Sequence, residues 1–223
     1  SRGLGDVYKR QAFHYAQKNN MIRVEHDFEA DVLSAARNLS ERYMSYTPHI
    51  DALTQMATLI FDTMKKVHGL GRRERLLLQV AAILHDCGKF ISMSAPGECA
   101  YQIIMSTEIL GISHMEREMV ASIVRYNTME LPNFNEFDGK LGNDEYLIVM
   151  KLAAILRVCN ALDRSHRQKF ADMKLTIKDS NIVITTAYPD NITLEKKTLQ
   201  DKQDFFEEVY GLGFEIKQKK KKQ

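Results

Sequence analysis

Hydrophobic residues recur every three or four positions through most of the chain up to residue 170, which is the pattern of helices that bury one face. The stretch 26–46 follows this pattern and predicts a helix. The next predicted helix starts at Pro48, a residue suited to a first helical turn, and ends at His68, which Gly69 follows. The helix predicted over 72–87 becomes apolar on nearly every side towards its end, which indicates burial inside a bundle.

Three further helices complete the predicted bundle, over 98–110, 113–127 and 144–165. The second of them opens with Ser113, and its first four residues have the spacing of a capping box. Proline, glycine, asparagine and aspartate are concentrated in 128–143, which predicts a loop before the last and longest helix.

The pattern changes after Phe170. Residues 174–179 and 182–188 alternate between hydrophobic and polar side chains, which predicts the two strands of a hairpin. A helix over 194–209 and a short strand over 214–217 follow. We therefore predict a mainly α protein, in which a small C-terminal α+β appendage follows a helical bundle.

The two ends of the chain differ from this core. Residues 1–11, SRGLGDVYKRQ, begin with Ser and show no apolar period, so we interpret them as a translated cloning or sequencing scar. On that interpretation a natural N-terminal portion is missing. The helical domain is then expected over 12–170, the appendage over 171–217, and a basic tail over 218–223.

Composition narrows the class of protein. Hydrophobic residues make up 44% and charged residues 27% of the chain, as in soluble globular proteins. The net charge of +2 excludes a strong global field. Three cysteines without a secretory signal indicate a reducing compartment, and no apolar run is long enough to span a membrane. We expect a cytoplasmic protein with neither a membrane nor a nucleic-acid partner.

The adjacent residues His85 and Asp86, in the segment HDCGK, carry the candidate chemistry. An imidazole nitrogen and a carboxylate oxygen can together bind a divalent cation. An isolated HD pair is weak evidence, but His49 lies on an earlier helix and acidic residues lie on a later one, which gives the order H…HD…D. That order resembles the HD phosphohydrolase superfamily, in which a metal activates water for attack on a phosphoester.

Four longer segments resemble the C-terminal region of the exopolyphosphatase and guanosine pentaphosphate phosphatase family, Ppx/GppA. They are RVEHDFEADVLSAARNLSERY (23–43), LLLQVAAILHDCGKFIS (76–92), STEILGISHMEREMVASIVRYN (106–127) and AAILRVCNALDRSHRQKF (153–170). The resemblance covers about residues 12–217 and implies an HD-domain-like helical bundle. Its most specific part is DRSHRQK, residues 163–169.

The resemblance also implies a division of labour within a longer enzyme. Members of the family carry two N-terminal actin-like domains, which hold the glycine-rich phosphate loops, the catalytic Glu and the Mg²⁺ site. No glycine-rich phosphate loop occurs in this sequence. We therefore expect neither a catalytic residue nor a cofactor in this chain. Its expected role is to bind inorganic polyphosphate or guanosine pentaphosphate and to support a homodimer.

The metal site of the HD pattern is incomplete in this sequence. Cys99 stands in a region where relatives carry histidines, and Asn160 stands where they carry aspartate. Asp163 lies three residues further on, and we expect it to pair with a neighbouring Arg. The loss of anionic ligands weakens a site for a hard cation. The candidate ligands of this degenerate site are His49, His85, Asp86, Cys99, Asn160 and Asp163.

Alternatives remain open for this site. A divalent metal at His49, His85 and Asp86 would make the chain an autonomous HD-domain phosphohydrolase acting on a nucleotide or phosphoester, with Asp86 as its catalytic residue. Cys99 could add a softer ligand to form a tetrahedral zinc set, or it could be a small buried hydrophobe. In a third interpretation the pocket senses a ligand similar to guanosine tetraphosphate.

Basic residues cluster at the end of the helix predicted over 144–165. Guanidinium groups suit phosphate oxygens, so the cluster predicts a substrate-binding rim. The same cations also complement the negative end of the helix dipole, and both interpretations stay open. The predicted rim consists of Arg157, Arg164, His166, Arg167 and Lys169.

Overall fold

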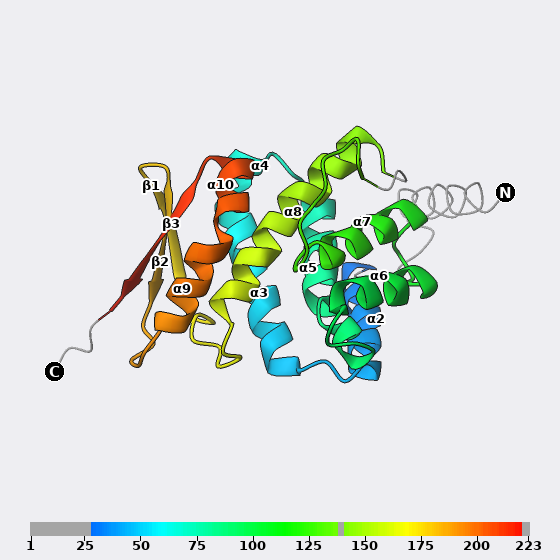
Figure 1. Cartoon of the computed structure of the whole chain (residues 1–223), viewed down its shortest axis with the longest axis horizontal. Coiled ribbons are helices and arrows are strands. Elements are labelled where there is room, and N and C mark those ends of the chain that lie inside the picture. Colours follow the sequence, from blue (N-terminus) through cyan, green and yellow to red (C-terminus); the bar gives the residue numbers. More distant parts are fainter. Residues whose placement is uncertain (1–27, 138–140, 220–223) are drawn as a thin grey trace, which may run out of the picture.

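The computed structural model describes residues 28–137 and 141–219, and it confirms a mainly α fold with a small sheet near the C-terminus (Figure 1). The elements follow one another in this order: α2 Phe28–Arg42, α3 Thr47–Thr63, α4 Lys65–His68, α5 Arg72–Leu84, the 3-10 turn η1 Cys87–Phe90, α6 Pro96–Ser106, α7 His114–Arg125, α8 Asn143–Leu162, β1 Lys174–Lys178, β2 Asn181–Thr186, α9 Thr193–Lys202, α10 Asp204–Tyr210 and β3 Gly213–Gln218. The predicted scar and the start of the predicted helical domain lie outside the described residues, as does most of the basic tail.

Helix α5 lies inside the bundle because it carries hydrophobic side chains on nearly every side along most of its length. It packs against α2, α3, α7 and α8, and its residues from Val80 to Leu84 are at most 1% exposed. The prediction that this helix is buried is therefore confirmed. A helix that is enclosed on all sides also ends inside the protein, so His85 and Asp86, which follow it, are buried as well.

The C-terminal appendage is a three-stranded sheet of order β1-β2-β3 with two helices. Strands β1 and β2 form the predicted antiparallel hairpin, whereas β3 runs parallel to β2, so the chain crosses over between them through α9 and α10. Ile182 and Ile184 on β2 are fully buried. Because α9 and α10 pack against α8, and β1 contacts α3, the appendage is attached to the bundle through its helices and its first strand, at the left of Figure 1.

Some predicted helix boundaries are wrong, and the backbone gives the reason. Helix α2 ends at Arg42 and not at residue 46, because Met44 adopts a left-handed backbone with φ 52°. Helix α5 ends at Leu84, so His85 is its C-cap and Asp86 lies beyond it. Both residues are thus held by the turn after the helix and not by its last helical turn.

Two other predicted helices also differ from the structure. The helix predicted over 98–110 runs from Pro96 to Ser106, because Thr107 is already extended. The helix predicted over 194–209 is divided at Gln203 into α9 and α10. By contrast, the capping box at the start of α7 is confirmed. The Ser113 side chain accepts from the backbone N–H of Glu116, and the Glu116 side chain accepts from the backbone N–H of Ser113.

His68 organises the turn between α3 and α5. The single helix predicted from Pro48 to His68 is interrupted at Met64, and α4 forms a separate short turn. The backbone N–H of Leu70 donates to Nδ1 of His68 at 2.8 Å, and Nε2 donates to the carbonyl of Phe61 at 2.8 Å. This pattern requires the neutral imidazole, and burial lowers the pKa of His68 below its usual value.

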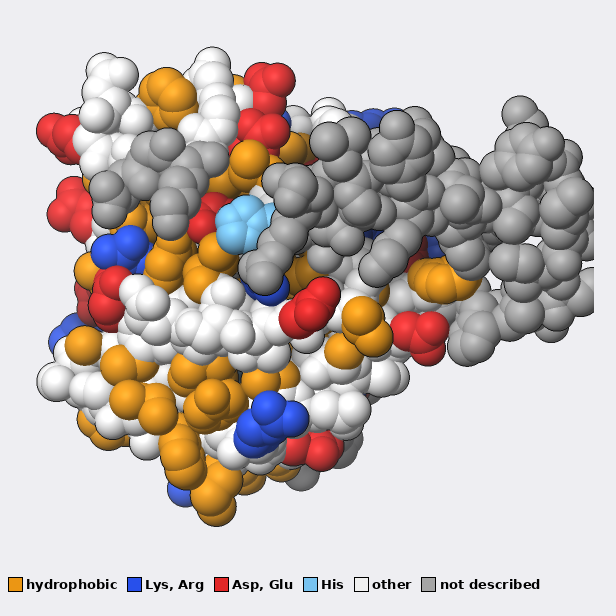
Figure 2. Space-filling model, turned by 90° about the vertical axis from the view of Figure 1, so that its right-hand side faces the viewer, with side chains coloured by type: hydrophobic (Ala, Val, Ile, Leu, Met, Phe, Trp, Pro, Cys, Tyr) orange, Lys and Arg blue, Asp and Glu red, His pale blue; other side chains and the backbone are white. Residues whose placement is uncertain are grey.

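The end of the molecule that carries α6 and α7 shows no broad charged field among its visible side chains. Figure 2 shows hydrophobic side chains gathered over the lower part of this face, with Lys and Arg scattered singly. Phe90, Ile91 and Met93, which follow the HD pair in the chain, are all more than half exposed.

None of the helices in the described part of the chain is long and apolar enough to cross a membrane.

We expect His68→Gln to make the free energy of unfolding less dependent on pH between 7 and 5. In the natural protein the unfolded state binds a proton below pH ~6.5, whereas the folded state resists protonation of His68, so stability is lost as the pH falls. The variant should also lose about 1–3 kcal/mol at pH 7, because a buried backbone group loses its partner. Urea unfolding at both pH values measures the effect, with the exposed His114→Gln as control; equal pH dependence in both variants would contradict the assignment.

Candidate functional site

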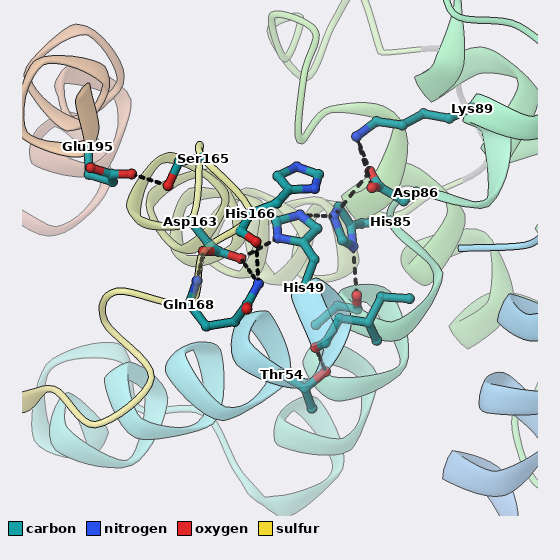
Figure 3. A network of polar contacts seen from close by, with 12 residues as sticks. His49, Thr54, His85, Asp86, Lys89, Asp163, Ser165, His166, Gln168 and Glu195 are labelled. Carbon is teal, nitrogen blue, oxygen red and sulfur yellow. Dashed lines mark hydrogen bonds and ion pairs between the residues drawn. The ribbon is translucent and has the colours of Figure 1, made fainter. Parts of the chain in front are cut away.

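His49, His85 and Asp86 come together in the interior of the bundle (Figure 3). His49 lies in the first turn of α3, His85 caps α5, and Asp86 begins the turn into η1. One ligand atom from each lies within 4.8 Å of the others, and all three residues are buried. Among the His, Cys, Asp and Glu of residues 28–137 and 141–219, no other set of three or more meets this criterion.

A glycine after the HD pair allows the backbones of η1 and α6 to approach closely. A Cβ atom on Gly88 would lie 1.9 Å from the carbonyl oxygen of Pro96 and 2.5 Å from the backbone nitrogen of Ala100. Any side chain at this position would therefore separate η1 from α6. The close approach holds Asp86 against the bundle, directly below the Lys89 side chain that shares its turn.

Outer hydrogen bonds fix the orientation of both imidazoles. Nδ1 of His49 contacts a carboxylate oxygen of Asp163 at 2.7 Å, and Nδ1 of His85 contacts the carbonyl oxygen of Ala82 at 2.8 Å. Since carboxylate and carbonyl oxygens only accept, each Nδ1 carries a hydrogen. The two Nε2 atoms then face each other at 3.1 Å. Hydrogen bonds of this kind also orient histidines that bind metals.

The facing Nε2 atoms require either a proton or a cation between them. Burial lowers the pKa of His85 to about 4, so at neutral pH its Nε2 carries a lone pair only. A hydrogen bond across 3.1 Å then needs a hydrogen between the two Nε2 atoms. A metal that took both lone pairs would displace that proton.

The Lys89 side chain pairs with Asp86, the third candidate ligand. Its ammonium lies 2.8 Å from Asp86, and Asp86 also lies 3.2 Å from Nε2 of His85. Although burial acts to raise it, the pKa of Asp86 is held below its usual value by His85 and by the hydrogen bond from Lys89. The group can therefore coordinate a divalent ion through two nitrogens and one oxygen, but the Lys89 ammonium competes for that oxygen.

The remaining predicted ligands do not complete the group. Asp163 lies behind His49 and accepts a hydrogen bond from the backbone of Gln168 at 2.7 Å, so its partner is a histidine and not the expected arginine. Cys99 is half-buried on α6, outside the three-residue group. Asn160 is half-buried on α8, and no hydrogen bond links it to the group within the described residues.

His166 belongs to this site, although its position was predicted only as part of a basic rim. Its ring stacks on His49, with centroids 3.9 Å apart and planes 7° apart. The backbone of His166 is left-handed, with φ 54°. A positive φ at a histidine leaves no signature in the sequence, so the stacking could not be foreseen. Lys89 was also missed, although its spacing of three residues from Asp86 in HDCGK was visible.

The predicted basic rim is divided by the structure. Arg157 is turned inwards, where its guanidinium donates to the carbonyl oxygens of Tyr126 and Met129 and lies over the ring of Phe205. Burial lowers the pKa of Arg157. Its hydrogen bonds go to carbonyl oxygens of the protein itself. Arg164 and Arg167 are exposed on the loop after α8. These two side chains are the accessible guanidinium groups of the predicted rim.

Lys169 is held at the edge of a small cavity. Its ammonium contacts Glu195 at 3.0 Å and donates to the carbonyl oxygen of Asn191 at 2.8 Å. The cavity has a volume of about 280 Å³ and opens beside the first turn of α9. It is lined by Arg167, Lys169, Tyr188, Asp190, Asn191, Thr193 and Leu194. Two of the five predicted rim residues therefore share one cavity.

Comparison with known proteins matches residues 33–204 to the family model described as Ppx/GppA phosphatase, domain III. A curated relative is the guanosine-5'-triphosphate,3'-diphosphate pyrophosphatase of Photobacterium profundum, which is 21% identical over 160 residues. The aligned region is 72% of this chain and 31% of the relative, so the chain spans about a third of the length of the curated relative it matches.

We expect Lys89→Met to strengthen binding of Co²⁺ by about tenfold, because the ammonium no longer competes for Asp86. Uptake should release protons, since the metal displaces the one between the two imidazoles. Cobalt absorption titrations in unbuffered and buffered solution measure both effects. Lys65→Met, at an exposed position of α4, is the matched control. Equal affinity in the two variants would show that Lys89 does not compete.

Proposed function

Because the chain belongs to the Ppx/GppA phosphatase family, we propose that it holds a phosphate chain for catalytic domains that lie elsewhere in a longer protein. The family model matched by residues 33–204 is a third domain, and the relative is about three times as long as the aligned region. The proposed ligands are inorganic polyphosphate or guanosine pentaphosphate. The name of the relative supports the guanosine nucleotide as one of them.

The cavity beside α9 is the observation that carries this proposal. Arg167 lines it and is exposed, so its planar guanidinium is available to two phosphate oxygens at once. Thr193 and Leu194 of the first turn of α9 also line the cavity, so the positive end of this helix dipole lies beside it. Arg164 lies on the same loop and extends the positive charge beyond the cavity. A linear polyanion suits a row of separate positive groups, because each of its phosphates can contact one of them.

A supporting role, without catalysis, agrees with the charges of the buried group. Its three candidate ligands are His49, His85 and Asp86, and Lys89 contacts the only carboxylate among them. A hydrolytic metal centre needs an open coordination position for water and a stable set of ligands. In this protein the Lys89 ammonium lies 2.8 Å from that carboxylate and would compete with a cation for it.

A metal-dependent phosphohydrolase is the second candidate, favoured by the convergence of two Nε2 atoms and one carboxylate oxygen. His49, His85 and Asp86 would hold the ion, which would supply a Lewis acid and a more acidic bound water. The residues themselves would only bind and orient it, since Asp163 and the carbonyl of Ala82 fix the two rings. Release of orthophosphate by the isolated chain, lost in His85→Ala, would favour this candidate.

The proposal includes a homodimer, which the family resemblance implies. Exposed hydrophobic side chains after the HD pair, including Phe90 and Ile91, offer apolar area that association could bury. Sedimentation equilibrium of the chain across a range of concentrations tests this part independently of ligand binding. A monomer at all concentrations would remove the dimer from the proposal and leave the phosphate-binding role intact.

We expect Arg167→Glu to weaken polyphosphate binding by about tenfold and to lower the dependence of affinity on salt. Each phosphate contact releases condensed counterions, so the loss of one contact reduces the slope of log affinity against log salt by about one. Titration calorimetry at several salt concentrations measures both quantities. Arg42→Glu, at an exposed position in the last turn of α2, applies the same change of charge away from the cavity. Polyphosphate affinity that is unchanged by Arg167→Glu, or flat against salt, would contradict the proposed site.

A further inference from the structure

Strand β3 forms one edge of the small sheet. The order β1-β2-β3 leaves one long side of β3 without a neighbouring strand among the residues that the structure describes. Glu215 and Lys217 are exposed, whereas Phe214 and Ile216 are half-buried. In Figure 1 the strand (red) lies at the opposite end of the molecule from α6 and α7. An open edge of this kind is a template for pairing with another strand.

The backbone groups of β3 point alternately towards β2 and away from it. Gly213 and Lys219, at the two ends of the ladder, donate their backbone N–H groups to carbonyl oxygens on the β2 side. Because alternate residues of a strand direct these groups to the same side, Phe214, Ile216 and Gln218 direct theirs outwards. In the described part of the chain, these three residues make no backbone hydrogen bond on that outer side. Their N–H and carbonyl groups are therefore available to a further strand.

The sequence of β3 is complementary to itself in the antiparallel direction. When two copies pair with Ile216 opposite Ile216, Glu215 of each copy lies opposite Lys217 of the other. Opposite charges directly across an antiparallel pair stabilise it. The same register pairs Phe214 with Gln218 through their outward backbone groups, and the half-buried Ile216 side chains meet at the centre.

The two faces of β3 suit such a pair. Phe214 and Ile216 are in register with buried isoleucines of β2, and the ring of Phe214 lies 4.6 Å from that of Phe206 on α10. These side chains therefore lie on the face that the helices cover. Glu215 and Lys217 lie on the opposite face, where both are more than half exposed and contact each other at 3.3 Å. Their charges can exchange partners with a second copy without disturbing the core.

The other edge of the sheet has a different charge pattern. Antiparallel pairing of two β1 strands about Thr176 would place Lys174 opposite Lys178, and like charges in that position destabilise a pair. Lysines on an edge strand commonly protect it from association, and β1 fits that role. In β3 the lysine is matched by a glutamate two residues away, so two copies of this edge attract one another.

We propose that the open edge of β3 binds the β3 strand of a second copy of this chain, antiparallel and with Ile216 on the two-fold axis. The two three-stranded sheets then form one continuous sheet. The same edge is used by both copies, so the pair is closed and adds no third copy. The inference rests on the homodimer included in the proposed function, and it names the surface and the register of that dimer.

Sedimentation equilibrium of the full chain at several concentrations tests the register. Glu215→Lys and Lys217→Glu should each weaken dimerisation by at least about tenfold, because each places like charges opposite one another on both sides of the axis. An equimolar mixture of the two variants should associate about as tightly as the natural chain, since two lysines of one copy then face two glutamates of the other. Lys174→Glu applies a change of charge to the exposed edge strand β1 and should leave dimerisation unchanged.

The possible results separate this inference from the function on which it rests. A dimer that both single variants leave unchanged would use another surface, so the β3 edge would be excluded while the homodimer stands. Single variants that weaken the dimer without recovery in the mixture would overturn the proposed register. A natural chain that stays monomeric at all concentrations would remove both the edge pairing and the homodimer, and would leave phosphate binding intact. Recovery that occurs only in the mixture supports the pairing of Glu215 with Lys217 across the axis.

Discussion

The burial of four ionisable side chains at one point constrains the rest of this structure. His49, His85, Asp86 and Asp163 lie in the interior, where an unpaired charge or polar atom would be costly. Each is satisfied by another member of the group, by the Ala82 carbonyl or by Lys89. The first turn of α3, the end of α5 and the loop after α8 must therefore keep a fixed relative position, since a shift of one element would leave polar atoms of the others without partners.

Much of the fold follows from the sequence because it depends on the period of hydrophobic residues. The nearly continuous apolar end of α5 identified a buried helix, and the alternation after Phe170 identified the hairpin. Helix ends were harder to predict, because they depend on single backbone angles. Met44 ends α2 by adopting a left-handed conformation that a methionine rarely takes. Gln203 divides α9 from α10 without any glycine or proline that would mark the break.

Of the candidate site, only the grouping of its three candidate ligands was predictable from the sequence. The order of His49, His85 and Asp86 in the chain indicated a shared position, since these residue types at helix ends can meet in a bundle. The partner of Asp163 could not be deduced, because both an arginine nearby in sequence and a histidine far away in sequence satisfy a carboxylate equally well. Arg157 shows the same limit: its neighbours in the sequence suggest a surface cluster, whereas its bonds to Tyr126 and Met129 are formed by folding.

The loop from Asp163 to Lys169 touches both candidate sites. At one end Asp163 fixes His49, and at the other Arg167 and Lys169 line the cavity beside α9. Two left-handed residues between them leave this loop little freedom to deform locally. A ligand that moved one end would therefore change the free energy of the other. By thermodynamic reciprocity, if a ligand in the cavity shifts Asp163, the state of the buried histidines changes the affinity of the cavity by the same factor, and the seven residues would then form an allosteric connection.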